Sequence, residues 1–271
     1  MKSTRKQSTG EIRVGIGGWT YEPWRGHFYP DRLPHRRELE YAASRLTSIE
    51  INGTYYGSQK PESFQRWHDE TPDDFVFALK APRFATNRRR LSEAGESIGR
   101  FFTSGVTRLG RKLGPVNWQF ATTKAFDPED FSGFLDLLPD NADGIPLRHA
   151  VEVRHDSFRC EAFVALAREH GVAVVVAGDS QYPVIADVTA PFVYARIMGT
   201  REEEPAGYDE GGLRLWADRA RDWAAGGAAS GLDPVLPQAA DGARDVYLYV
   251  ISGHKPHNPA AAMGLIERLG R

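Results

Sequence analysis

The chain has 271 residues, of which 41% are hydrophobic and 26% are charged, a composition typical of a globular protein. Its formal net charge of -2 excludes a global electrostatic attraction to nucleic acid or to an anionic membrane and leaves only a local basic patch open. The single cysteine, Cys160, excludes an internal disulfide and favours a reducing compartment, so we expect a cytoplasmic protein. No apolar run approaches the roughly 20 residues that span a bilayer, so we expect no membrane partner.

Segments typical of β-strands alternate with segments of helical spacing along the chain. Strands are expected at residues 12–18, 48–52, 75–80, 115–120, from 149, 172–177, 192–197 and 245–251. Helices are expected at residues 36–46, 61–70, 93–112, 127–138, 160–170, 212–225 and 259–269. Such alternation produces parallel βαβ units, and the eight strands with their connecting helices favour a closed (β/α)8 barrel of the TIM type over a doubly wound sheet.

The barrel is expected to form a single domain that extends from residue 12 to residue 271. Residues 1–11 are polar and basic and are predicted to be a disordered tail. Residues 226–244 are rich in Gly, Ala, Pro and Asp and are predicted to be a flexible insertion loop before the last strand. No G-x-G-x-x-G motif follows the first strand, which argues against dinucleotide binding, and we predict no cofactor.

Polar and charged side chains stand at the ends of most of the expected strands, where the active sites of such barrels lie. Glu152 is the central example, because a carboxylate on a buried strand costs several kcal/mol unless it is paired. Arg154 is roughly 6–7 Å further along the strand, so we do not expect it to pair directly with Glu152. Glu152 is the candidate general acid or base, and Glu50 and His155 are further catalytic candidates.

Three chemistries remain open for this set of residues. Paired carboxylates suggest glycoside hydrolysis, but Glu50 and Glu152 are expected on roughly opposite sides of the barrel, beyond the roughly 5–10 Å of paired acids. Metal-assisted hydrolysis would draw on these two residues with His155, Asp179 and His254. The sequence contains no H-E-x-x-H or H-x-H pair, so we predict no metal site.

Binding of a small anionic or phosphorylated ligand is the leading hypothesis. Lys80, Arg154 and Arg196 provide cationic donors suited to phosphate or carboxylate. The aromatic segment that follows the first strand contains Trp19, Tyr21 and Trp24, which we expect to stack on a ligand or to cover it. We expect the ligand to be bound, or transformed, in a polar pocket at the carboxyl face of the barrel.

A basic run, Arg83–Arg90, follows the third strand and supports an alternative function as a nucleic-acid or other ligand-binding module. The acidic stretch Glu202–Glu204 follows the seventh strand on the same face. If the two stretches pair with each other, the basic run ceases to be a signal for nucleic acid.

Several motifs resemble those of the domain of unknown function 72, or YecE-like, family. They are G-x-G-G-W-x-Y-x-x-W-x-G-x-F-Y-P from Gly15, E-x-N-x-T-Y-Y from Glu50, K-x-P from Lys80, L-G-P from Leu113 with Gln119, E-x-R-H-x-S-F from Glu152, and Y-x-R from Tyr194. The resemblance runs from about residue 12 to residue 265. It implies a TIM-type barrel with a polar pocket at its carboxyl face, and it implies no established activity.

We therefore assign ligand binding to the residues of these motifs and of the strand ends. They are Trp19, Tyr21, Trp24, Asn52, Thr54, Tyr55, Lys80, Gln119, Arg154, Asp179 and Arg196. The chain departs from the family pattern at Asn87, at Met198-Gly199 and at Ser252-Gly253. The family commonly has His, His-Gly and paired Asn at these places, so two imidazoles are missing near the expected pocket.

Overall fold

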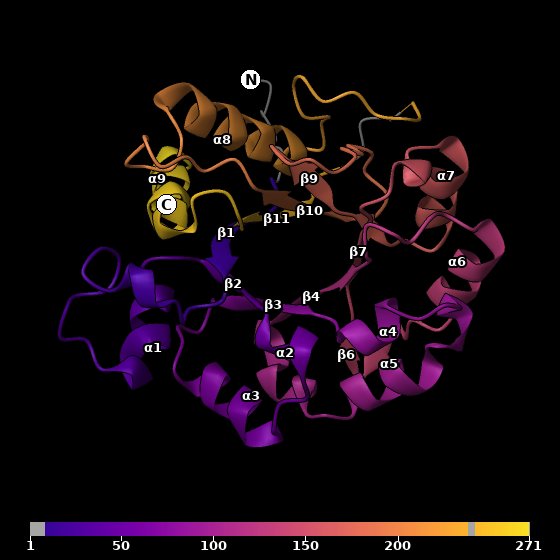
Figure 1. The fold of residues 1–271 in the computed structure, drawn as a ribbon, viewed down its shortest axis with the longest axis horizontal. Coiled ribbons are helices and arrows are strands. Elements are labelled where there is room, and N and C mark those ends of the chain that lie inside the picture. Colours follow the sequence, from indigo (N-terminus) through magenta and orange to yellow (C-terminus); the bar gives the residue numbers. More distant parts are fainter. Residues whose placement is uncertain (1–8, 238–241, 271) are drawn as a thin grey trace, which may run out of the picture.

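A ring of parallel strands lies at the centre of the molecule and is surrounded by helices (Figure 1). The structure, a computed structural model, describes residues 9–237 and 242–270. The strands of the ring are β1 (Ile12–Gly17), β2 (Ser48–Ile51), β3 (Val76–Lys80), β4 (Leu113–Gln119), β7 (His149–Glu152), β8 (Ala173–Val174), β9 (Val176–Gly178), β10 (Phe192–Ile197) and β11 (Asp245–Val250). This confirms the predicted TIM-type α/β barrel.

The sheet contains nine strands rather than the predicted eight, in the order β8-β7-β4-β3-β2-β1-β11-β10-β9. The difference arises in the expected strand 172–177, which is divided at Val175 into β8 and β9. β8 pairs with β7, and β9 pairs with β10. The two ends of the sheet are therefore consecutive pieces of one segment, and this segment closes the ring.

Helices connect the strands and pack on the outside of the ring (Figure 1). The α-helices are α1 (Glu38–Ala43), α2 (Gly53–Tyr56), α3 (Pro61–Asp69), α4 (Arg83–Thr86), α5 (Gly95–Phe102), α6 (Pro128–Leu135), α7 (Glu161–Glu169), α8 (Glu210–Ala224) and α9 (Asn258–Arg268). The 3-10 helices are η1 (Glu22–Trp24), η2 (His35–Arg37), η3 (Leu91–Glu93), η4 (Val106–Lys112), η5 (Asp156–Phe158) and η6 (Lys255–His257). In the ranges that the structure describes, no helix is long and apolar enough to span a membrane.

The prediction of one long helix over residues 93–112 is wrong. This segment forms η3, α5 and η4 instead: Gly105, with a φ of 103°, separates α5 from η4, and Gly110, with a φ of 52°, kinks η4. Glycine has no Cβ and takes this left-handed conformation readily, which ends a right-handed helix. A short antiparallel hairpin, β5 (Asn141–Ala142) with β6 (Ile145–Pro146), was also absent from the prediction.

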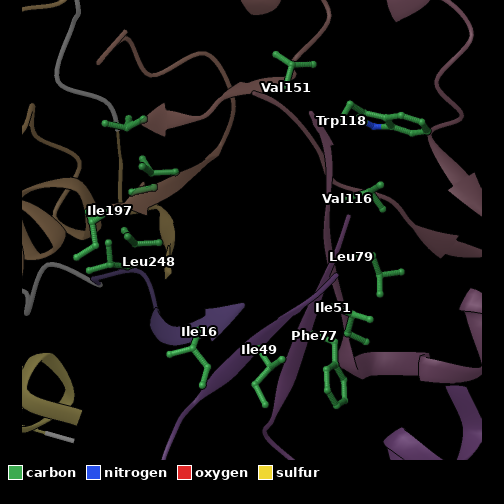
Figure 2. Close-up of a cluster of buried hydrophobic side chains, with 14 of the residues drawn as sticks. Ile16, Ile49, Ile51, Phe77, Leu79, Val116, Trp118, Val151, Ile197 and Leu248 are labelled. Carbon is green, nitrogen blue, oxygen red and sulfur yellow. The ribbon is translucent and has the colours of Figure 1, made fainter. Parts of the chain in front are cut away.

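Apolar side chains on the outer face of the strands form the main core with the helices. Figure 2 shows Ile16, Phe77, Trp118, Val151 and Leu248 pointing away from the centre of the ring, and all five are buried. Because successive side chains on a strand alternate between faces, the residues between them point into the barrel. That interior therefore receives the polar residues which the sequence places near the strand ends.

Two predicted irregular segments extend into parts of the chain that the structure leaves undescribed. Of the expected tail, residues 1–8 lie outside the described residues, whereas Gly10 N donates to Ala224 O at 2.9 Å and Glu11 N donates to Asp245 Oδ1 at 3.1 Å. Of the expected insertion loop, residues 238–241 lie outside the described residues. Its flexibility stays a prediction.

Candidate functional site

Two buried glutamates and one buried arginine form the centre of the barrel mouth. Glu50 follows Ser48 by two residues within β2, and Arg196 follows Tyr194 by the same spacing within β10, so each points into the barrel. Arg196 Nη2 donates to Glu50 Oε1 at 3.0 Å, and its Nη1 donates to Glu152 Oε2 at 2.5 Å. All three side chains are almost completely buried. The guanidinium therefore neutralises carboxylates from two separate strands.

Arg154 is a direct partner of Glu152, contrary to our expectation from the sequence. Its Nε and Nη2 donate to Glu152 Oε1 at 2.9 and 2.6 Å. The expectation was wrong because β7 ends at Glu152, so the two residues do not lie on one extended strand, and the long arginine side chain reaches back to the carboxylate. Arg154 Nη1 also donates to Tyr182 Oη at 3.2 Å, and the guanidinium carbon lies 4.3 Å from the centre of that ring.

The two glutamate carboxylates lie close together, and the expectation of a wide separation was wrong. Asn117 Nδ2 donates to Glu50 Oε2 at 3.4 Å and to Glu152 Oε2 at 3.2 Å. These two oxygens are therefore no more than about 6.6 Å apart, the sum of 3.4 and 3.2 Å. The strands are distant along the sheet, but the side chains converge towards the barrel axis.

Lys80 completes the cluster that Glu50, Glu152, Arg154 and Arg196 form. It bonds to no carboxylate of the described residues. Its Nζ donates to Gln119 Oε1 at 2.9 Å and lies 4.0 Å from the centre of the Tyr55 ring. Gln119 Nε2 in turn donates to Glu152 Oε2 at 2.8 Å, so the amide links the ammonium to the glutamate. Thr54 Oγ1 donates to Lys80 O at 2.7 Å and fixes the end of β3 against α2.

These contacts shift the pKa values of the two key groups in the same direction for different reasons. Burial alone would raise the pKa of the Glu152 carboxyl, but Arg196 and Arg154 outweigh burial and lower it to about 2. Burial lowers the pKa of the Lys80 ammonium to about 8, although the neighbouring carboxylates oppose the shift. Glu152 is therefore ionised at neutral pH, whereas Lys80 is mainly protonated at neutral pH and loses its proton around pH 8.

Three contributors to the cluster were missing from the candidate residues. Tyr194 Oη donates to Glu50 Oε2 at 2.6 Å, Asn117 bridges the glutamates, and Tyr182 supports Arg154. The alternation of strand side chains provided a signal for two of them. Tyr194 precedes Arg196 by two residues and Asn117 precedes Gln119 by two, so each pair shares the inner face. Tyr182 lies in an irregular loop, where no such pattern exists.

The aromatic residues expected to cover the ligand lie elsewhere. Trp19 packs edge-on against Trp67, with ring centres 5.3 Å apart, on the helix side of the barrel. Trp24 is fully buried and its Nε1 donates to Lys255 O at 3.0 Å. The Tyr21 ring lies 4.0 Å from Lys255 Nζ. The first motif therefore joins the loop after β1 to the segment before α9.

Three further candidates are also placed in structural contacts outside the cluster. The Asn52 amide lies beside the glycine turn that follows β1. His155 Nδ1 accepts from Ser157 N at 3.2 Å at the start of η5. Asp179, in the left-handed region with φ 52°, accepts from Tyr208 Oη at 2.9 Å and from Trp216 Nε1 at 2.7 Å. Among the described residues, no group of three or more His, Cys, Asp or Glu side chains is arranged to hold a metal ion.

The cluster has more positive than negative groups. Arg196, Arg154 and Lys80 contribute three cations when Lys80 is protonated, against the two carboxylates of Glu50 and Glu152. Two buried polar atoms, Asn117 Oδ1 and Arg196 Nε, have no hydrogen-bond partner within the described part of the chain. The arrangement thus retains both a positive charge and unused hydrogen-bonding capacity.

Comparison with known proteins gives one family model that matches most of the chain. The family model described as "Protein of unknown function DUF72" matches residues 13–271. The UPF0759 protein YecE of Escherichia coli (strain K12) is 30% identical over 150 residues, which cover 54% of this chain and 50% of that protein. The aligned region thus spans about half the length of that curated relative.

Solved structures show the same fold over nearly the whole chain. A crystal structure of a DUF72 family protein from Thermotoga maritima MSB8 matches with a TM-score of 0.72 and 21% identity, covering 96% of this chain and 100% of that one. A DUF72 family protein from Enterococcus faecalis V583 matches with a TM-score of 0.69 and 16% identity, covering 97% and 99%. At these identities the likeness supports the fold alone.

Proposed function

The chain belongs to the DUF72 family of proteins of unknown function, and we propose that its barrel mouth binds a small anionic ligand such as a phosphorylated or carboxylated metabolite. The observation that carries the proposal is the surplus positive charge of the cluster. Arg196 bonds to both glutamates, and Arg154 adds a second cation to Glu152. Lys80 bonds to an amide and faces an aromatic ring instead.

Lys80 and Arg154 are the two residues that would hold the anion. Lys80 Nζ can donate three hydrogen bonds and makes one in this cluster, to Gln119. Arg154 Nη1 faces Tyr182, whose hydroxyl can donate to the same ligand. Gln119 and Tyr55 hold the lysine side chain in place before the ligand binds. The side chain therefore loses less conformational entropy when the ligand binds.

If the ligand is also transformed, Lys80 is a better candidate than Glu152 for proton transfer. A general acid or base works best when its pKa is near the working pH. The pKa of about 8 at Lys80 meets this condition, and the pKa of about 2 at Glu152 does not. Glu152 and Glu50 then serve to position the arginines.

A thermal-shift screen of phosphorylated and carboxylated metabolites tests the proposal. We expect at least one anion to raise the Tm of the wild-type protein and to lose its effect in Lys80→Gln and in Arg154→Met. Lys255→Gln is the matched control, because Lys255 Nζ also lies 4.0 Å from a tyrosine ring but outside the cluster. A screen without a stabilising anion, or a ligand whose effect survives both substitutions, would refute the proposal.

A further inference from the structure

A small cavity beside α2 and α4 lies outside the cluster at the barrel mouth. Its volume is about 220 Å³, below the roughly 300–1,000 Å³ of pockets that hold drug-sized ligands. Polar side chains and two phenylalanines share its walls: Thr54, Ser58, Gln59, Phe84, Ser97, Arg100, Phe101 and Ser104. A single heteroaromatic ring system has the size and the mixed apolar and hydrogen-bonding character that such walls accept.

Two large aromatic side chains are exposed at this place. Phe84 lines the cavity and is 60% exposed, and Tyr56, which precedes the cavity residue Gly57, is 65% exposed. The Tyr56 ring packs edge-on against Tyr55, with ring centres 5.1 Å apart, so it is held rather than loose. Exposed aromatic rings of this kind are the platforms on which unpaired bases stack.

The basic run Arg83–Arg90 includes the exposed Phe84. The Arg83 guanidinium lies 5.5 Å from the centre of the Phe84 ring, and Arg88 Nη2 donates to the cavity residue Ser97 at 2.9 Å. The side chains of Arg83, Arg89 and Arg90 are exposed and bond to no carboxylate of the described residues. Positive charge next to stacking rings is the combination that binds a single strand.

The acidic stretch after β10 does not neutralise this run. Glu203 and Glu204 lie 3.7 and 3.3 Å from Arg201, in their own loop, and Arg201 also pairs with Asp209 at 2.9 Å. The expected pairing between the acidic and basic stretches is therefore absent among the described contacts of Glu203 and Glu204. The charge of the basic run remains available to an anionic partner.

We propose that this surface binds single-stranded nucleic acid, with one base in the cavity lined by Phe84 and Ser97 and the adjoining phosphates on Arg83 and Arg89. The exposed Tyr56 ring stacks a neighbouring base. Ser58, Gln59 and Ser97 line the cavity and would supply hydroxyl and amide groups for the edge of the inserted base. This site is separate from the anion site at the barrel mouth, and neither proposal depends on the other.

Fluorescence anisotropy of a labelled single-stranded oligodeoxythymidylate with the full chain, over a range of salt concentrations, tests the proposal. We expect Phe84→Ala to weaken binding at least about fivefold, the low end of what one stacked base contributes. We expect the double variant Arg83→Ala with Arg89→Ala to weaken binding. The plot of log K against log salt should become less steep by about 1.4, or about 0.7 for each lost phosphate contact. Arg32→Ala with Arg36→Ala, two exposed arginines outside the surface, is the control of equal charge.

Two further probes separate base recognition from charge and a strand from a free nucleotide. A strand of the same length with abasic sites keeps the phosphates and is expected to bind at least fivefold more weakly. A mononucleotide is expected to bind much more weakly than the oligonucleotide. If the abasic strand binds as tightly as the intact strand, no base is inserted into the cavity. If the mononucleotide binds as tightly as the oligonucleotide, the ligand is not a strand. If the control variant Arg32→Ala with Arg36→Ala loses as much affinity as Arg83→Ala with Arg89→Ala, the strand does not bind at this surface.

Discussion

Arg196 joins Glu50 and Glu152 across the interior of the barrel, with one guanidinium nitrogen on each carboxylate. The three residues come from β10, β2 and the end of β7, which are far apart in the sequence. All three are buried, so each charge depends on the other two. The barrel mouth is therefore a single electrostatic unit and not a set of independent strand ends.

Replacing Arg196 by methionine should destabilise the protein strongly. The substitution keeps much of the side-chain length but leaves two buried carboxylates without their shared cation, and breaking a buried ion pair typically costs about 3–5 kcal/mol. The free energy of unfolding in urea measures this loss. Arg201→Met is the control, because Arg201 pairs with several carboxylates at an exposed site and should cost less than about 1 kcal/mol. Equal losses in the two variants would contradict a special role for the buried unit.

The ionisation of Glu152 should make the protein less stable in acid. Its pKa of about 2 in the folded protein is below the ordinary 4.5, so the ionised carboxylate stabilises the fold above pH 4.5. This contribution, on the order of 3 kcal/mol, should disappear as the pH falls from about 4.5 to about 2. Urea unfolding of wild type and Glu152→Gln over this pH range should show the two stabilities converging. A constant difference between them would show that the charge of Glu152 is not the cause.

The Lys80 amine should react with acylating reagents at a lower pH than ordinary lysines. Its pKa of about 8 means that a large part of the folded population carries the neutral, nucleophilic amine at pH 8, whereas the unfolded chain reaches this state only near 10.5. Mass spectrometry of the Lys80 peptide after brief acetylation at different pH values gives the midpoint. The same peptide from denatured protein is the control, and coinciding midpoints would disprove the shift.

The same lowered pKa also fixes the sign of one stability effect. Between pH 8 and pH 10.5 the unfolded chain holds a proton on Lys80 that the folded protein has released. The contribution of Lys80 to stability therefore rises as the pH rises through this range. A Lys80→Met variant lacks this contribution, so the difference in unfolding free energy between it and wild type should change in favour of wild type towards pH 10.5.

Gly178→Ala should disturb the junction between β9 and α8. An added Cβ would lie 2.2 Å from Cη2 and 2.4 Å from Cζ2 of the buried Trp216 ring, which packs too tightly to move away freely. Overpacking of this kind typically costs about 1–3 kcal/mol. Gly57→Ala is the matched control, since a Cβ there meets no atom within 4 Å. Thermal unfolding of both variants should show a clear loss of Tm only for Gly178→Ala.

The sequence predicts the framework of the barrel better than its connections. Strands such as Phe192–Ile197 are rich in β-branched and aromatic residues, and their expected bounds match the structure. The prediction of one continuous helix over residues 93–112 was wrong although the apolar residues have helical spacing. The breaks at Gly105 and Gly110 depend on local backbone angles, which the spacing does not reveal. A glycine within a helical pattern is tolerated in many helices, so its presence alone does not predict a break.

The candidate site shows the same division. Alternation along strands is sufficient to direct Glu50, Lys80, Glu152 and Arg196 into one interior. The pairing of Arg154 with Glu152 could not be predicted from spacing, because it depends on where the strand ends and on how a long side chain folds back. The first aromatic motif was also ambiguous, since a tryptophan such as Trp24 can cover a ligand or fill a core, and only its buried position decides.

The division of one strand at Val175 has a consequence for the folding of the barrel, because this segment closes the ring through two short pairings. On one side of this residue, two pairs of residues join β8 to β7, and on the other side three pairs join β9 to β10. The hydrogen bond from Val175 N to Val151 O, at 2.9 Å, lies between them. The other strands pair in an unbroken series, β7-β4-β3-β2-β1-β11-β10, which can assemble without this segment. Because its pairings are short, we expect this segment to join the barrel last and its amide protons to exchange with solvent before those of β1 and β11.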